Sequence, residues 1–139
     1  MADERYIRWQ GLAITQLSVA VSLISALSVA GIGFGVSTLT NEPAAPVGFL
    51  LASMLFLGVA ALCSCAAVVT RLLDFRLTAR KVRKDREPDY EKPLKIFWRD
   101  KDEYGKATWR LFWVGLVAFL IGVSGLAISY GQVVVSRVL

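Results

Sequence analysis

The chain of 139 residues contains no histidine and only two cysteines, Cys63 and Cys65. Histidine is the commonest general base and a frequent zinc ligand, so its absence argues against a catalytic triad and against a zinc site. On a helix the two cysteines point about 200° apart, so they cannot bind one metal or each other. The sequence also has no P-loop and no Gly-x-Ser-x-Gly motif. We therefore predict a protein that is not an enzyme, with no catalytic residue, metal or cofactor.

Charged residues are missing from most of the chain. Three stretches contain no Asp, Glu, Lys or Arg: 9–41, 43–70 and 111–136. Each is longer than the roughly 20 residues that cross a bilayer as a helix. This pattern excludes a soluble globule, a disordered chain and a secreted disulfide scaffold. It predicts an all-α, three-span membrane protein with a single membrane domain over 1–139. The predicted spans cover about 11–38, 47–72 and 109–135.

The few charges that remain indicate an orientation. Thirteen of the 16 Lys and Arg residues lie within 71–110, two precede the first span, and the 40–46 linker has none. By the positive-inside rule, the N-terminus and the 73–108 segment are cytoplasmic and the C-terminus is outside. Neither Gly nor Pro occurs in 71–87, so we expect the second span to continue as a basic cytoplasmic helix. The predicted location is the cell membrane, as a multi-pass protein with a cytoplasmic N-terminus.

The first charge-free stretch has an alternative interpretation as a signal peptide. A signal peptide has an apolar core of roughly 7–15 residues, and the apolar run here is nearly twice as long. We therefore interpret it as an uncleaved membrane span.

Each span carries one stripe of small or hydroxyl residues at helical spacing. The stripes consist of Thr15, Ser18, Ser22 and Ser25 in the first span; Ser53, Ala60, Ser64 and Ala67 in the second; and Gly115, Ala118, Gly122, Gly125 and Ser129 in the third. Helices in a bilayer associate where small residues let their backbones approach. We therefore predict that Gly115, Gly122, Gly125 and Ser129 are helix-packing residues. Large residues are available for the lipid side: Leu55, Phe56, Leu57, Leu116, Phe119 and Ile121.

The stripe of Thr15, Ser18, Ser22 and Ser25 has two interpretations. In the first, the stripe lines a polar pore. Such a pore would need an oligomer, because three spans of one protomer cannot enclose a channel. In the second, the stripe is packing surface between helices. Hydroxyls in membrane helices can satisfy themselves on the carbonyl four residues back, so the stripe does not need water. The absence of charge inside the spans argues against an ion pump or a proton-coupled transporter.

The most basic stretch of the cytoplasmic segment also has two interpretations. Its residues include Arg76, Arg80, Lys81, Arg83 and Lys84. In the first, they contact anionic lipid headgroups, and each basic residue near the surface contributes about 1 kcal/mol to membrane binding. In the second, they dock an anionic partner. Such a partner would be an acidic cytoplasmic protein or a nucleotide-linked regulator. We expect no sequence-specific binding of nucleic acid.

The Ser-rich first span, the second span and the basic helix resemble the SLATT family of small bacterial membrane effectors. The resemblance covers about residues 11–86 and includes the string Phe75-Arg76-Leu77-Thr78-Ala79-Arg80-Lys81-Val82-Arg83. In that family a two-span hairpin is followed by a cytosolic helix. The resemblance implies an oligomeric, pore-forming effector of the bacterial inner membrane, controlled by a cytosolic partner. The third span, 111–136, lies outside the family pattern.

Two functional hypotheses follow from these features. The first is a homo-oligomeric membrane protein that forms a pore or perturbs the membrane and is regulated through its basic cytoplasmic segment. The alternative is a non-catalytic accessory or assembly subunit of a larger membrane complex. The two hypotheses differ in where the polar stripes lie: facing a common axis between copies, or buried within one protomer.

Overall fold

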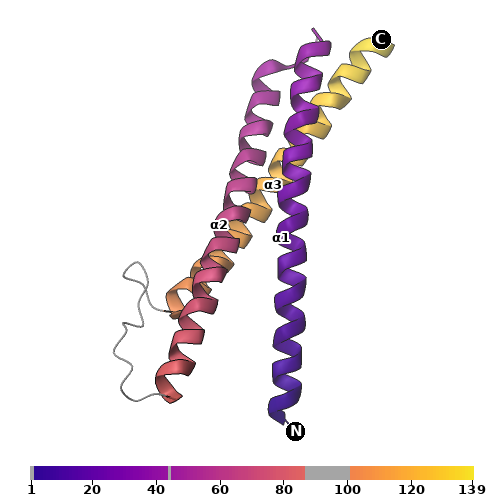
Figure 1. Ribbon diagram of the computed structural model, residues 1–139. Coiled ribbons are helices and arrows are strands. Elements are labelled where there is room, and N and C mark those ends of the chain that lie inside the picture. Colours follow the sequence, from indigo (N-terminus) through magenta and orange to yellow (C-terminus); the bar gives the residue numbers. More distant parts are fainter. Residues whose placement is uncertain (1, 44, 87–100) are drawn as a thin grey trace.

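The computed structural model of the chain is a bundle of three long helices (Figure 1). Their bounds are Ala2–Asn41 for α1, Val47–Arg86 for α2 and Lys101–Val138 for α3. The structure describes residues 2–43, 45–86 and 101–139, with side chains in 4–5, 7–43, 45–79 and 103–139. Each helix has a segment long and apolar enough to cross a membrane: Ile7–Asn41, Val47–Ala79 and Glu103–Val138. This confirms the prediction of an all-α chain with three candidate spans.

The connection between α1 and α2 is short and closes one end of the bundle. The carbonyl of Pro46 accepts the first hydrogen bonds of α2, from the N–H groups of Phe49 and Leu50 at 3.1 and 3.0 Å. Proline is favourable beside a helix start because its missing N–H would have no partner inside the helix. The guanidinium of Arg137, in the last turn of α3, pairs with the carboxylate of Glu42 in this connection. We call this the closed end.

α2 and α3 pack so tightly that two glycines of α3 have no room for a side chain. A Cβ atom on Gly125 would lie 2.1 Å from the Oγ of Ser53, and one on Gly122 would lie 2.7 Å from the Cγ of Leu57. The carbonyl oxygen of Ser53, a backbone atom, would also lie 3.1 Å from a Cβ on Gly122. The two backbones therefore approach closely at these positions, which is how helices associate in lipid.

Leu57 lies where all three helices meet, and its side chain is 0% exposed. It contacts the glycine surface of α3 at Gly122, and a Cβ on Gly31 of α1 would lie 2.7 Å from its Cδ1. The prediction that Leu57 faces lipid is therefore wrong. Of the other residues assigned to the lipid side, Leu116 and Phe119 are half-buried, whereas Leu55, Phe56 and Ile121 are exposed. Leu57 fills the space that small residues leave on both neighbouring helices.

α1 packs on the other two helices near the closed end and diverges from α2 toward its own N-terminus (Figure 1). A Cβ on Gly35 would lie 2.9 Å from Met54 of α2, and Phe34 makes an edge contact with Tyr130 of α3 at 5.5 Å between ring centroids. In contrast, every described side chain from Glu4 to Gln16 is exposed. We call the N-terminal side of α1 the open end of the bundle.

Thr70 of α2 and Thr108 of α3 form a hydrogen bond between helices, with 2.7 Å between their Oγ1 atoms. Each hydroxyl also lies within range of a carbonyl of its own helix, at Ala67 (3.0 Å) and Tyr104 (2.8 Å). Two hydroxyl hydrogens cannot serve three contacts at once. One of the two threonines therefore bonds to its own helix while the other donates across the interface.

We expect Thr108→Val to destabilise the bundle by about 0.6 kcal/mol, a typical value for a hydrogen bond between membrane helices. The loss stays small because Thr70 can donate to the carbonyl of Ala67 instead. Unfolding in mixed micelles would measure it. Thr70→Val and the double variant complete a cycle that isolates the pair. A coupling free energy well above about 1.7 kcal/mol would contradict this account.

Candidate functional site: a groove between α1 and α2

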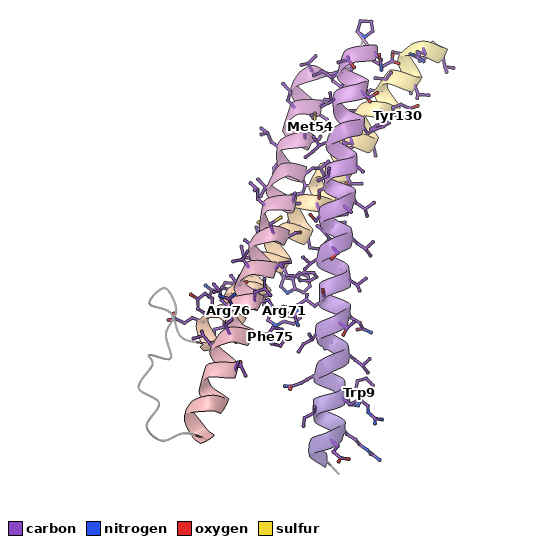
Figure 2. All side chains as sticks on the ribbon, viewed as in Figure 1. Trp9, Met54, Arg71, Phe75, Arg76 and Tyr130 are labelled. Atoms are coloured by element: carbon purple, nitrogen blue, oxygen red, sulfur yellow. The ribbon has the colours of Figure 1, made fainter. Side chains whose placement is uncertain are left out.

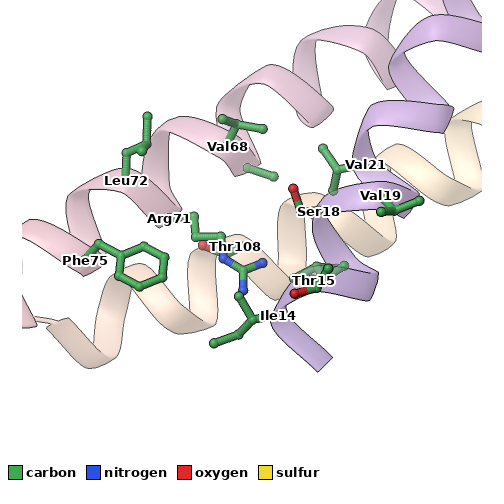
Figure 3. A pocket seen from close by; sticks show the side chains of 12 residues that line it. Ile14, Thr15, Ser18, Val19, Val21, Val68, Arg71, Leu72, Phe75 and Thr108 are labelled. Carbon is green, nitrogen blue, oxygen red and sulfur yellow. The ribbon is translucent and has the colours of Figure 1, made fainter. Parts of the chain in front are cut away.

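A groove opens between α1 and α2 where the two helices diverge. Its outer part, the mouth, has a volume of about 380 Å³ and is bounded by both helices and by Thr108 of α3 (Figure 3). Its inner part, with a volume of about 480 Å³, continues toward the closed end. Val21 and Val68 line both parts, so the two hollows adjoin each other. We refer to them together as the α1–α2 groove.

The hydroxyl stripe of α1 forms one wall of this groove. Thr15 and Ser18 line the mouth, whereas Ser22 and Ser25 line the inner part. Ser25 is half-buried and the other three are exposed. The hydroxyl of Thr15 donates to the carbonyl of Gly11 at 3.0 Å, and that of Ser22 donates to the carbonyl of Ser18 at 2.9 Å. These two hydroxyls are satisfied within α1, so they leave no orphaned donor on a face that meets lipid or another helix.

The face that α1 turns to its own protomer is a different one. Val21, Ile24 and Ser28 are buried there, and the hydroxyl of Ser28 donates to the carbonyl of Ile24 at 2.6 Å. Ser28 is six residues from Ser22, which places the two side chains about 120° apart around the helix. Ser28, which was not assigned to the stripe, is therefore the serine of this helix that packs inside the bundle, and the stripe lies beside the interface.

The small-residue stripes of α2 and α3 are covered within the protomer. All nine of their residues are buried: Ser53, Ala60, Ser64, Ala67, Gly115, Ala118, Gly122, Gly125 and Ser129. A Cβ on Gly115 would lie 3.1 Å from the Cβ of Cys63, so α2 and α3 also approach closely near this position. The hydroxyls of Ser53 and Ser129 donate to carbonyls of their own helices, each at 2.8 Å. Among the described residues, the stripe left uncovered is that of α1.

Two charged residues of α2 that were not predicted as site residues lie at the groove: Arg71 lines its mouth, and Asp74 lies beside it. Both line a side hollow of about 390 Å³ where α1, α2 and α3 meet. Figure 3 shows the guanidinium of Arg71 extending from α2 toward Ile14 of α1. The sequence signal was available, because Arg71 is the first charged residue after the long uncharged stretch of α2 and Asp74 follows one helical turn later.

The predicted basic contact residues are only partly described. Arg76 is exposed, and Figure 2 places it on the opposite side of α2 from Arg71 and Phe75. The side chains of Arg80, Lys81, Arg83 and Lys84 lie outside the described part of the chain, although the backbone of α2 continues through them.

Comparison of the chain with family models, with curated proteins and with solved structures gave no match. The α1–α2 groove and the uncovered stripe of α1 therefore carry the functional argument.

Proposed function

We propose that this chain is a membrane protein that assembles into a homo-oligomer in which the hydroxyl stripe of α1 faces a common axis, and that the oligomer forms a pore or perturbs the membrane. The main support is the contrast between the three stripes. Those of α2 and α3 are buried within the protomer, whereas Thr15, Ser18 and Ser22 of α1 stay exposed. Small and hydroxyl residues are typical of faces where membrane helices associate. A second copy of α1 is the simplest partner for this face.

A water path, where one exists, has to run between copies of the chain. The three helices of one protomer pack against one another around Leu57, which fills the space between them at that level. The face that remains for a neighbouring copy carries hydroxyl groups, which can line a path for water or polar solutes. In the proposed arrangement, the stripes of several copies surround a common axis.

The proposed topology places the N-terminus of α1 and the extension of α2 to Arg86 in the cytoplasm. The excess of Lys and Arg over 71–110 supports this orientation. In this position the basic extension would contact anionic headgroups or an acidic or nucleotide-linked regulator. The resemblance to SLATT effectors of the bacterial inner membrane supports the same arrangement.

A second candidate function is that of an accessory or assembly subunit in a larger complex. It is favoured by the burial of two of the three stripes inside one protomer. Under this hypothesis the stripe of α1 docks one helix of a different protein, and the purified chain remains a monomer without permeability of its own.

The pore hypothesis predicts that replacing Ser18, Ser22 and Ser25 together by valine suppresses leak of a dye from liposomes while the oligomer survives. Valine removes the hydroxyls that hold water and presents apolar methyl groups instead, so the path should dewet. Dye leak and native mass spectrometry on the same samples measure the two properties. Ser124→Val is the matched control, because Ser124 is exposed on α3 outside the groove.

Two results would count against the pore. Unchanged leak in the triple variant would show that the stripe does not line the path. A wild-type chain that stays monomeric and never permeabilises liposomes would leave the accessory-subunit hypothesis.

A further inference from the structure

We propose that Arg71 and Asp74 form a binding site for the headgroup of a phospholipid that carries a primary amine, with the phosphate on Arg71 and the ammonium on Asp74. This site differs from the proposed function of the hydroxyl stripe because it uses charged residues of α2, and it opens on the mouth of the groove that Thr15 and Ser18 also line. It also differs from the predicted basic contacts, which begin at Arg76 on another side of the helix.

Arg71 is a cation without a partner in a largely apolar setting. Arg71 is half-buried, and the mouth around it is formed mainly by side chains such as Ile14, Val68 and Leu72. Within the described residues, the one ion pair joins Glu42 to Arg137, so Arg71 has no carboxylate in contact. A partly buried charge is costly unless it is paired. A phosphate fits this need, since the guanidinium can donate two parallel hydrogen bonds to its oxygens.

Asp74 supplies a complementary unsatisfied group. Its Oδ1 is shielded from solvent and has no hydrogen-bond partner in the part of the chain that the structure describes. Asp74 follows Arg71 by three residues, so the two lie on neighbouring positions of one helix face, with Cβ atoms about 5–6 Å apart. They line the same side hollow but do not form an ion pair. A ligand with a negative and a positive group side by side would satisfy both.

The chemistry of Asp74 selects among phospholipid headgroups. A primary ammonium has three N–H donors, as in lysine, and one of them can pair with the Asp74 carboxylate once that side chain turns toward the hollow. A quaternary choline has no N–H donor. A headgroup with a phosphate but no cation would be repelled by the carboxylate. The site therefore fits phosphatidylethanolamine better than phosphatidylcholine or phosphatidylglycerol.

The position of the site suits a lipid. Arg71 follows directly on the uncharged stretch 43–70, which places it where α2 leaves the apolar layer. From there the mouth continues along its apolar residues Leu17, Val21 and Val68. A headgroup held by Arg71 and Asp74 would thus have its acyl chains beside apolar residues. Pockets of this kind between membrane helices bind lipid headgroups in other proteins.

Native mass spectrometry of the full chain, with phosphatidylethanolamine, phosphatidylcholine and phosphatidylglycerol of identical acyl chains, tests the proposal. We expect the wild-type chain to bind phosphatidylethanolamine about tenfold more tightly than phosphatidylcholine, as one charge-assisted hydrogen bond would give. Arg71→Gln should weaken binding of all three lipids about tenfold. Asp74→Asn should remove the preference for the primary amine but keep the contact with phosphate. Arg76→Gln, an exposed position on the same helix, should change neither.

Three outcomes would overturn the proposal. Equal binding of phosphatidylethanolamine and phosphatidylcholine would exclude recognition of the amine. Tighter binding of phosphatidylglycerol than of phosphatidylethanolamine would indicate a plain anionic site. Equal effects of Arg71→Gln and Arg76→Gln would mean that the groove does not hold the headgroup. The first two comparisons use the wild-type chain and do not depend on the folding of a variant.

Discussion

Gly122→Leu should separate α2 from α3 and cost the bundle about 3 kcal/mol or more, the upper range for overpacking. Even the first atom of a side chain at this position would lie 2.7 Å from the Cγ of Leu57 and 3.1 Å from the carbonyl oxygen of Ser53. The leucine side chain can rotate away, but the carbonyl belongs to the backbone of α2 and can move only if the helices part. Unfolding in mixed micelles would measure the loss of stability, and cross-linking of cysteines placed across the α2–α3 interface would detect the separation.

Gly131→Leu is the matched control for this prediction. Gly131 lies on the same helix, and no atom of another residue lies within 4 Å of a Cβ built there. The glycine-to-leucine change at position 122 therefore meets the backbone of α2, whereas the same change at position 131 meets open space. Similar losses from the two variants would show that helix propensity or membrane insertion, and not the close approach, sets the cost.

Leu57→Ala is expected to destabilise the bundle by about 2 kcal/mol, near the lower end of the range for leucine-to-alanine changes in protein cores. Leu57 fills the space between Gly31 of α1 and Gly122 of α3, so its removal leaves a cavity between the two glycines. The transfer part of the usual cost is small here because lipid is as apolar as the bundle interior. The loss of packing contacts remains.

Leu55→Ala provides the comparison for Leu57→Ala, since the side chain of Leu55 is 72% exposed on the same helix. It should be close to neutral, because in a bilayer both leucine and alanine at that position meet lipid. Unfolding of both variants in mixed micelles would test the difference. A larger loss from Leu55→Ala than from Leu57→Ala would mean that α2 turns another face to its neighbours.

The sequence by itself determined that the chain has three apolar helices and that the second begins beside Pro46, whereas α1 and α3 begin earlier than the predicted spans of about 11–38 and 109–135. A bilayer offers no partner for backbone N–H and C=O groups, so a long uncharged stretch in lipid has to form a helix. Pro46 marks the start of α2, and the run without Gly or Pro after Arg71 allows α2 to continue to Arg86. These conclusions depend only on local backbone hydrogen bonding and on the presence or absence of charge.

Only the tertiary structure decided which faces meet. Leu57 and Leu55 are equally apolar, and lipid accepts both, so hydrophobicity does not show which one is buried. Three stripes of small residues indicate three faces that can pack, but they do not identify the pairs. The arrangement of the helices covers the stripes of α2 and α3, leaves that of α1 exposed, and brings Arg71 beside Ile14. Such pairings depend on shape complementarity between distant segments, which no local pattern in the chain encodes.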